Sequence, residues 1–518
     1  MLSLESPITI FFAVVVLLVS SWPLTVLLTK RPFWASFPAI TIGLALCTAL
    51  YVAGVVSLAV LAPRMTILLA VVAAVGGAMY WWRARPTFGH RRKLPPGSLA
   101  LAPADMFLDP AFFEKQNKMY GPIFKTSHFL HPMVCIVSFD TGFEVLRQYE
   151  DTALRPPEAP FARYIKCSYL RSMSVEDHDK YRPILQAAVS SEVTDACAPE
   201  VSAALIRGLE RMAKDSKQDD LGRPLQNYAE EALYEVLFRV FFGIVPGSQE
   251  CKEFRELYRT LDRAHRRQAT RVWSPSDRIV DQALREIYTR LNRRIKSFAQ
   301  TPSIVPESYL EAAWRHGGLP AVNETVQGNM IFLLQVSCVD LTGLFQWILK
   351  KLSDHPEWQM RLRGGIQQHG KDSVPATDLA ERIVSETFRL EQSEHIYRKV
   401  LQPIQIKNFH IPKGWLLRIC VRESHHCSPV FEDPESFNPD RFLGRTYGPT
   451  EYAPFGLYRK RCIGVHTLKR IGGIFVKELV HGYEWRVTDG GIQDFRGWHW
   501  TPGSTFAVSL NQSSVPHP

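Results

Sequence analysis

The sequence predicts a mainly α-helical protein preceded by amino-terminal transmembrane helices. Three features predict this fold class: three long uncharged apolar runs within the first 82 residues, a helical pattern from about residue 185 to 320, and one long apolar helical pattern over residues 323–353. A chain of 518 residues, 46% of them hydrophobic, can bury a large core and is longer than one average domain.

The amino-terminal region is expected to anchor the chain in a membrane. Residues 8–29, 33–63 and 65–82 carry no charged side chain, and each run is near or above the ~20 residues that span a bilayer. Basic residues follow the first and third runs, so the positive-inside rule predicts an outside amino terminus and a cytosolic remainder. We expect a membrane anchor over residues 1–93 with up to three transmembrane helices. One true anchor with two interfacial or re-entrant segments is the alternative.

The charge and the cysteine content narrow the function classes. A net charge of +10 favours an acidic partner or an anionic membrane surface. No helix-turn-helix, zinc-finger or stacked-aromatic signature accompanies this charge, which argues against nucleic acid as a partner. The nine cysteines are scattered and form no C-x-x-C pair, which argues against a zinc site or a disulfide framework and suits a reducing compartment.

The soluble domain is predicted to begin at residue 94 with a stiff Leu-Pro-Pro-Gly hinge. The residues Tyr-Gly-Pro-Ile-Phe at 120–124 predict a turn that enters a strand. Further on, His178 and Arg182 lie four residues apart in a predicted helix. A polar pair at this spacing is common on a solvated helix face, so the pair alone does not indicate a site.

The long helix predicted over residues 323–353 is apolar nearly all round, which is typical of a buried helix. It contains Ser337-Cys-Val-Asp340-Leu341-Thr342, so an acid is expected inside the core. A buried aspartate is costly without a partner or a task. Asp340 is therefore a candidate functional residue.

A later predicted helix carries Glu386 and Arg389, which can pair at a spacing of three residues. The pattern is weak by itself, because Glu256 and Arg259 have the same spacing. Arg441 follows within Phe-Asn-Pro-Asp-Arg-Phe, between this pair and the cysteine loop described next.

The stretch Ala453–Gly464 holds one cysteine, Cys462, directly after Arg459, Lys460 and Arg461 and before a predicted helix. A helix N-terminus and neighbouring cations both lower the pKa of a thiol. An anionic sulfur on a glycine-bracketed loop suits the proximal ligand of a haem iron. A basic surface loop with an ordinary cysteine is the alternative.

This loop resembles the haem-binding signature of the cytochrome P450 superfamily, Phe-x-x-Gly-x-(Arg/His)-x-Cys-x-Gly. Phe455, Cys462 and Gly464 match, whereas Tyr458 stands at the family's glycine and Lys460 at its propionate-facing Arg/His. The resemblance implies heme b with its iron bound by the Cys462 thiolate. It also implies a catalytic domain over residues 94–518, mostly helical and triangular, with a smaller sheet-rich part.

Other motifs resemble the same family in the same order. His178 and Arg182 match the family's Trp/His and Arg, and Arg398 lies in the strand predicted after the helix that carries Glu386 and Arg389. The resemblance implies that these residues are propionate partners. It implies a buried charge network of Glu386, Arg389 and Arg441. On the central helix, Asp340 falls on the family's acid, Leu341 on its threonine, and Thr342 on the next residue.

The resemblance implies a haem-thiolate monooxygenase that inserts one oxygen atom from O₂ into an apolar small molecule. Asp340 and Thr342 are the candidate catalytic residues, with Ser337 or a water as an alternative relay. Electrons are expected from NADPH through NADPH-cytochrome P450 reductase, optionally with cytochrome b5, docked on a basic face around Cys462. Because leucine at 341 has no donor, a haem isomerase or dehydratase that uses no external electrons is the alternative.

The expected substrate is a terpenoid, polyketide, sterol or fatty-acid-like molecule, because a membrane-anchored enzyme suits apolar substrates. The anchor and the altered motifs resemble fungal-type enzymes of secondary metabolism. Membrane lipid is an expected partner, and the endoplasmic reticulum membrane, with the catalytic domain on the cytosolic side, is the expected location.

Overall fold

The computed structural model describes residue 71 and residues 94–99, 105–128, 131–157, 168–216, 222–268, 277–298, 300, 304–391, 395–427, 429–495 and 499–513. The membrane runs predicted within residues 8–82 lie outside the described residues, apart from residue 71, so the anchor stays a prediction. Contacts along the chain divide it into the units Met1–Ala84 and Arg85–Pro518, and the second unit is described below.

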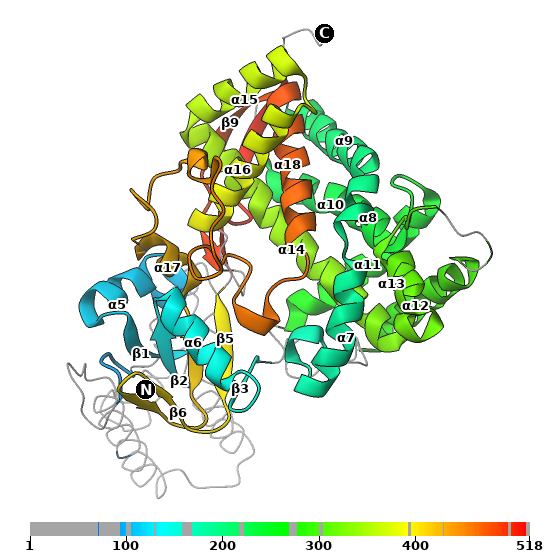
Figure 1. Ribbon diagram of the computed structural model, residues 1–518. Helices are drawn as coiled ribbons and strands as arrows, with labels where there is room; N and C mark the ends of the chain where they lie inside the picture. The colour runs from blue at the N-terminus through cyan, green and yellow to red at the C-terminus, as the bar shows by residue number, and fades with distance from the viewer. Residues whose placement is uncertain are drawn as a thin grey trace, which may run out of the picture. The chain divides into compact units, whose positions relative to one another are not determined.

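This unit is mainly helical, as the sequence predicts (Figure 1). Its α-helices are α4 (Asp105–Leu108), α5 (Phe112–Tyr120), α6 (Phe139–Tyr149), α7 (Val175–Ala188), α8 (Ser191–Ala196), α9 (Ala198–Ser216), α10 (Leu225–Phe242), α11 (Gln249–Gln268), α12 (Asp277–Phe298), α13 (Tyr309–Gly317), α14 (Glu324–Asp354), α15 (Pro356–His369), α16 (Val374–Leu390), α17 (Val421–Cys427) and α18 (Val465–Gly482). Short 3₁₀ turns are η3 (Leu170–Ser172), η4 (Leu319–Val322), η5 (Pro439–Phe442) and η6 (Tyr458–Lys460).

Within the described residues, the smaller β part consists of four sheets. The strands are β1 (Ile123–His128), β2 (His131–Ile136), β3 (Leu154–Arg155), β4 (Arg223–Pro224), β5 (Ile396–Val400), β6 (Ile404–Ile406), β7 (Phe409–Ile411), β8 (Leu416–Ile419), β9 (Tyr483–Asp489), β10 (Asp494–Phe495), β11 (Trp500–Thr501) and β12 (Ala507–Gln512). The largest sheet has the order β1-β2-β8-β5-β3, with β2 parallel to β8 and the other pairs antiparallel. The others are β4-β12-β9 and the pairs β6-β7 and β10-β11.

The predicted turn into a strand is confirmed, because α5 ends at Tyr120 and β1 begins at Ile123. In the large sheet, register aligns Cys135 of β2 with Arg418 of β8 and Tyr397 of β5. These three residues point to the face that packs with α5, while the alternate residues form the apolar face beside α6. Figure 1 shows α5 and α6 with this sheet, at one end of the unit.

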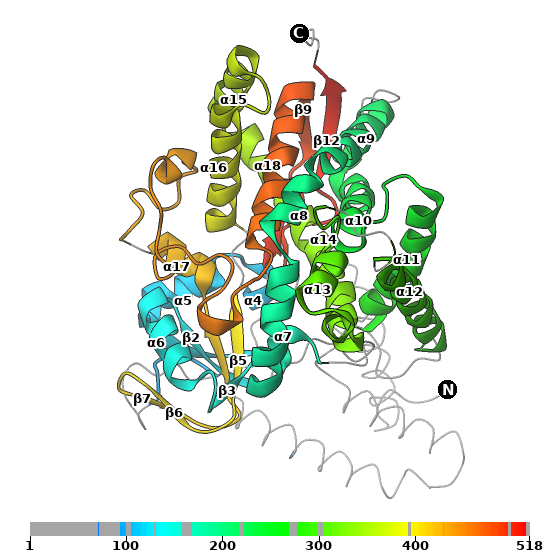
Figure 2. The same ribbon diagram turned by 45° about the vertical axis from the view of Figure 1, so that its right-hand side comes forward.

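The long apolar pattern forms the single helix α14, as predicted. Asn323 caps it, since its side chain accepts the Val326 N–H (3.1 Å). α14 packs against α10, α16 and α18, which surround it in Figure 2. Phe345 of α14 stacks on Phe475 of α18 with ring centroids 3.7 Å apart. Gly472 allows this close approach, because a Cβ there would lie 3.1 Å from side-chain atoms of α14 and α16.

Among the described residues, α14 is the one helix long and apolar enough to cross a membrane by length and composition. Its most apolar window has a mean hydropathy of 1.5, but 72% of that window is buried inside the protein. The apolarity of α14 is therefore explained by its place in the core.

Candidate active site

The loop before α18 holds Cys462 by backbone hydrogen bonds on both sides. The Cys462 N–H donates to the Phe455 carbonyl (2.9 Å), and the Gly464 N–H donates to the Cys462 sulfur (3.3 Å). Since α18 begins at Val465, the sulfur lies at the amino end of an 18-residue helix. N–H donors and helix N-termini both stabilise a thiolate. Cys462 therefore lies where backbone donors and a helix N-terminus stabilise negative charge.

Cys462 lines a cavity whose walls come from distant parts of the chain. The cavity contains about 1200 Å³ of empty space, part of it open to solvent. Phe455 and Gly464 of the cysteine loop also line it. Much of the remaining wall is apolar and includes Leu170, Phe241, Phe332, Leu333, Val336 and Phe388. Such a wall suits a flat, largely apolar prosthetic group or substrate.

The charged residues of the wall are mostly cations. Among the described lining residues, one carboxylate, Asp340, faces four permanent or near-permanent cations: Arg171, Arg182, Lys460 and Arg461. Burial lowers the pKa of Lys460 to about 8. Burial, followed by repulsion from Lys460 and Arg182, lowers the pKa of His178 to about 4. This excess of crowded positive charge favours an anionic ligand group.

His178 and Arg182 lie on α7 and both line this cavity, and their role as propionate partners stays a prediction. His178 is buried, and its Nε2 has no hydrogen-bond partner. A buried ring nitrogen left unpaired inside a cavity is costly unless a ligand or water meets it. Arg182 donates from Nη2 to the Arg461 carbonyl (2.9 Å), which ties α7 to the cysteine loop.

Arg398 has a buried carboxylate partner within the protein. It is on β5, as predicted, but it is absent from the described residues that line the cavity. Its Nε donates to both carboxylate oxygens of Glu150 (2.9 Å each), and both side chains are 1% exposed. A propionate role for Arg398 stays a prediction, and it requires the guanidinium to be shared with Glu150.

One face of α14 lines the cavity. Leu333, Val336, Ser337 and Asp340 follow the spacing of three and four residues that places side chains on one helix face. Asp340 therefore points to the cavity, where the resemblance implies an acid. Ser337 brings a hydroxyl to the same face, one turn before Asp340.

Leu341 and Thr342 are not among the lining residues. Leu341 is fully buried in the main core cluster. Thr342 is 4% exposed, and its hydroxyl donates to the Cys338 carbonyl one turn back (2.7 Å). The hydroxyl of α14 that reaches the cavity is thus that of Ser337, while the predicted catalytic role of Thr342 stays a prediction.

A residue that sequence reasoning missed also lines the cavity. His499, directly before β11, has a side chain that is 3% exposed, and its Nδ1 lies 3.8 Å from Asp340 Oδ1. Its surroundings in the sequence, Gly-Trp-His-Trp, match no motif. Only the fold, which returns the end of the chain to α14, shows the contact.

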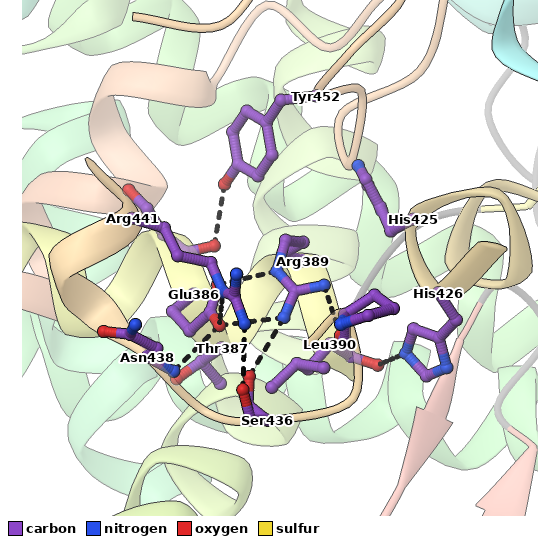
Figure 3. A network of polar contacts seen from close by, with 12 residues as sticks. Glu386, Thr387, Arg389, Leu390, His425, His426, Ser436, Asn438, Arg441 and Tyr452 are labelled. Carbon is purple, nitrogen blue, oxygen red and sulfur yellow. Dashed lines mark hydrogen bonds and ion pairs between the residues drawn. The ribbon is translucent and has the colours of Figure 1, made fainter. Parts of the chain in front are cut away.

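The structure brings Glu386, Arg389 and Arg441 together in one buried cluster (Figure 3). Arg389 donates to both oxygens of Glu386 (2.7 and 2.8 Å), and both side chains are 0% exposed. Arg441 donates from Nε to Glu386 Oε1 (3.3 Å), and the Asn438 N–H donates to the same oxygen (3.0 Å). The remaining Arg389 donors reach the carbonyls of Pro434 and Ser436.

This cluster connects α16 to the segment that leads to Cys462. The Tyr452 hydroxyl donates to the Ser385 carbonyl (2.9 Å), and the Ala453 N–H donates to His425 Nε2 (3.1 Å). Phe388 of α16 packs on Phe455 of the cysteine loop (ring centroids 4.7 Å apart). The charge network therefore supports the start of the loop that positions the thiol.

Tyr458, which stands where the family signature has glycine, adopts a backbone conformation that favours glycine. Tyr458 has a φ of +57°, in the left-handed region that favours glycine. A side chain there costs about 1–2 kcal/mol. Its ring meets Phe143 edge-on (5.8 Å between centroids), a contact worth about 0.5–1.5 kcal/mol. The ring contact offsets much of the backbone strain.

The basic face predicted around Cys462 is partly neutralised. Arg459 donates to Asp151 (2.6 Å) and to Asp179, and Arg470 pairs with Asp195 (2.9 Å). Arg461 remains exposed. The cationic character of this face is therefore weaker than the sequence alone indicates.

Comparisons with known proteins agree with the geometry. The family model for cytochrome P450 matches residues 107–309 and 343–499, well over half of the chain. The interval 310–342 falls between the two matched ranges, and it contains both Asp340 and Thr342.

Similar curated proteins include abscisic acid 8'-hydroxylase 3 of Oryza sativa subsp. indica, 24% identical over 427 residues (77% of this chain and 83% of that protein). Cytochrome P450 87A3 of Oryza sativa subsp. japonica is 26% identical over 462 residues (77% and 82%). The solved structure of retinoic acid-bound cyanobacterial CYP120A1 aligns with a TM-score of 0.64 and 19% identity, covering 81% of this chain and 99% of that one. This likeness shows the fold.

Proposed function

The chain belongs to the cytochrome P450 family and is a monooxygenase of that family, and from this premise we propose that it inserts one oxygen atom from O₂ into an apolar small molecule. The observation that carries the proposal is Cys462, held at a helix N-terminus against a cavity with an apolar wall and a cluster of cations.

The residues of the cavity fit heme b. Cys462 would supply the iron ligand, and His178, Arg182 and Lys460 would meet the propionates. Two features support this fit. A propionate would provide the hydrogen-bond partner that His178 Nε2 lacks, and its negative charge would raise the lowered pKa of Lys460. When bound, a thiolate-ligated haem activates O₂ for oxygen insertion.

The chain's own contribution is to orient groups and move protons. We propose that Asp340 holds a proton at its carboxylate on the cavity face of α14, with the Ser337 hydroxyl beside it. Thr342 would have to give up its bond to the Cys338 carbonyl to take part. The apolar wall excludes water and holds an apolar substrate.

The substrate class, partners and location complete the proposal. Abscisic acid, named for several relatives, is a terpenoid, which supports a terpenoid among the terpenoid, polyketide, sterol and fatty-acid-like alternatives. We propose a role in secondary metabolism, a fungal-type anchor of up to three spans in the endoplasmic reticulum membrane, and NADPH-cytochrome P450 reductase as electron donor.

Tags at the amino and carboxyl ends of the chain test the membrane anchor. With three spans, the amino-terminal tag is lumenal and the carboxyl-terminal tag is cytosolic.

The haem assignment is tested by the absorption of the reduced, carbon monoxide-bound protein. The wild type should show the band of a thiolate-ligated haem, and Cys462→Ala should lose it. Cys427→Ala is the matched control, because this thiol is exposed and is not among the lining residues. A wild-type protein that binds no haem under conditions where a known family member does would overturn the proposal.

The isomerase or dehydratase alternative depends on Leu341, which cannot donate a hydrogen bond. The missing hydroxyl at position 341 is a weaker argument for this alternative in the structure, because Leu341 faces the core. The cavity face of α14 already carries Ser337 and Asp340. Turnover with and without NADPH and reductase separates the two reactions. Product formation from an oxygenated or peroxide substrate without NADPH would support the alternative.

A further inference from the structure

His499 lies at the cavity, beside the carboxylate of α14. Its Nδ1 is 3.8 Å from Asp340 Oδ1, and both side chains line the cavity that Cys462 also lines. The imidazole is almost fully buried, whereas the Asp340 side chain keeps 27% exposure. An imidazole and a carboxylate at this separation can form an ion pair whenever the ring is protonated.

The position of His499 is fixed by the helix that carries Asp340. Trp347 of α14 donates from Nε1 to the carbonyl of Trp500 (2.8 Å), the residue after His499. Gln346, its neighbour on α14, donates from Nε2 to the Gly503 carbonyl (2.9 Å). Both donors are buried, so each bond is protected from water. Two turns after Asp340, α14 therefore clamps the segment that presents His499.

The other side of the histidine segment is also packed. β10 and β11 pair antiparallel with Phe495 opposite Trp500, and the two rings meet at 5.4 Å. His395, before β5, stacks on Phe495 (5.8 Å) and approaches Glu423 of α17 to 3.9 Å. The strand β11 that directly follows His499 is thus packed against both α14 and β10.

The charged and titratable groups around this region come from several elements. Asp340 of α14 faces His499 directly. Burial, then Arg418 of β8, Arg422 of α17 and His499 itself lower the pKa of His395 well below its usual value. His395 is therefore neutral, and an added proton on this side of the cavity is better placed at His499, next to Asp340.

We propose that His499 and Asp340 form a proton-transfer pair that serves the cavity. The proton on His499 Nδ1 passes to Asp340 Oδ1: the N–H bond breaks, the O–H bond forms, and the ring becomes neutral. Asp340 then holds the proton on the cavity side of α14, and solvent returns one to the imidazole. His499 acts through Asp340 and is a positioning residue. This inference rests on the proposed haem-dependent function.

The spacing of 3.8 Å is longer than a hydrogen bond, but acid–base contacts in enzymes often tighten only when the reacting molecules are bound. Histidine suits the role because its pKa lies near neutral pH and because its two nitrogens can accept and release a proton in turn. Glutamine has a similar reach and can donate a hydrogen bond, but it cannot carry the proton. His499→Gln therefore separates proton transfer from hydrogen bonding.

The test uses the haem-loaded, full-length protein and needs no substrate. Hydrogen cyanide binds a ferric haem as cyanide and must leave its proton on a nearby base, so its binding runs the proposed transfer in reverse, from Asp340 to His499. Carbon monoxide binds the reduced haem without releasing a proton. We expect His499→Gln to slow cyanide association at neutral pH by about tenfold or more, since acid–base groups contribute about 10²–10⁴-fold. Carbon monoxide association should change by less than about twofold.

Three further variants complete the design. Asp340→Asn should slow cyanide association at least as much as His499→Gln, and the double variant should be no slower than Asp340→Asn alone. His128→Gln is the matched control, because this half-buried histidine packs on Phe107 and Tyr397 and is not among the lining residues. It should leave both association rates unchanged. His499→Asn serves if His499→Gln does not fold.

The inference is overturned if His499→Gln keeps the wild-type cyanide rate, or if the cyanide and carbon monoxide rates fall equally, which would indicate altered access. Additive effects in the double variant would also overturn it. Each of these results is obtained on protein that shows the carbon monoxide band. A wild type without that band would instead remove the proposed function.

Discussion

Replacing Glu386 by glutamine should lower the free energy of unfolding by about 3–5 kcal/mol, the cost of breaking a buried charge network by removing one partner. Glu386 is 0% exposed and accepts two hydrogen bonds from Arg389, one from Arg441 and one from the Asn438 N–H. Glutamine keeps the shape but removes the charge. It leaves a fully buried guanidinium without a counter-charge.

Glu144 provides the matched control, because its pair with Lys407 has the similar length of 2.9 Å but side chains that are 53% and 55% exposed. Exposed pairs contribute about 0–1 kcal/mol, so Glu144→Gln should change the unfolding free energy by less than about 1 kcal/mol. The two variants make the same chemical change and differ in burial. Their comparison therefore isolates the effect of the buried network.

The assay is denaturation by urea, followed in parallel by tryptophan fluorescence and by haem absorption. Because Tyr452 and Ala453 are tied to α16 and α17 beside this network, the haem signal of Glu386→Gln should be lost at lower urea than the fluorescence signal. Equal midpoints for Glu386→Gln and Glu144→Gln would refute the reasoning. So would a large loss of stability with the haem signal unaffected.

Three other predictions concern the loop, the helix and the pH. Tyr458→Gly should be more stable than Tyr458→Ala by about 1 kcal/mol in urea denaturation, since both lose the ring but only alanine keeps the cost of a positive φ; equal stabilities would contradict this. Ser337→Ala should lower the product formed per NADPH more than Thr342→Val, because only Ser337 lines the cavity; the reverse order would refute the assignment. His425 is fully buried, and burial, followed by repulsion from Arg389, holds its pKa well below 6.5. The unfolded chain therefore binds the proton first, and stability falls as the pH falls below 6.5. His425→Gln should reduce this loss of stability by up to about 1 kcal/mol per pH unit between pH 6 and 5, and an unchanged slope would count against the prediction.

The sequence identified residues that the structure brings together where they lie close to one another within one short motif. Glu386 and Arg389 share one helix, and Cys462 sits between basic residues and a helix start. In both cases local spacing determines much of the geometry. The long helix and the strand entry were predicted for the same reason, because periodicity and turn residues are local signals.

The sequence could not supply contacts that depend on the path of the whole chain. Glu150 lies 248 residues before Arg398, and no local pattern links the two. The rotation of α14 about its own axis is set by its neighbours, which is why Ser337 rather than Thr342 reaches the cavity. Alignment with the family motif identified the candidate residues on this helix, but it did not show which of them face the cavity.

The apolar character of α14 also bears on how the protein is made. During synthesis beside a membrane, a 31-residue helix whose most apolar window has a mean hydropathy of 1.5 is a candidate for insertion before the core exists to receive it. Asp340 lies near the middle of this helix, where an acidic side chain opposes membrane insertion by about 2.5–3.5 kcal/mol. The carboxylate that we assign to proton transfer would thus also oppose insertion of the nascent helix into lipid. A substitution such as Asp340→Leu would remove the proton carrier and, in the same step, favour insertion of this core helix into a membrane.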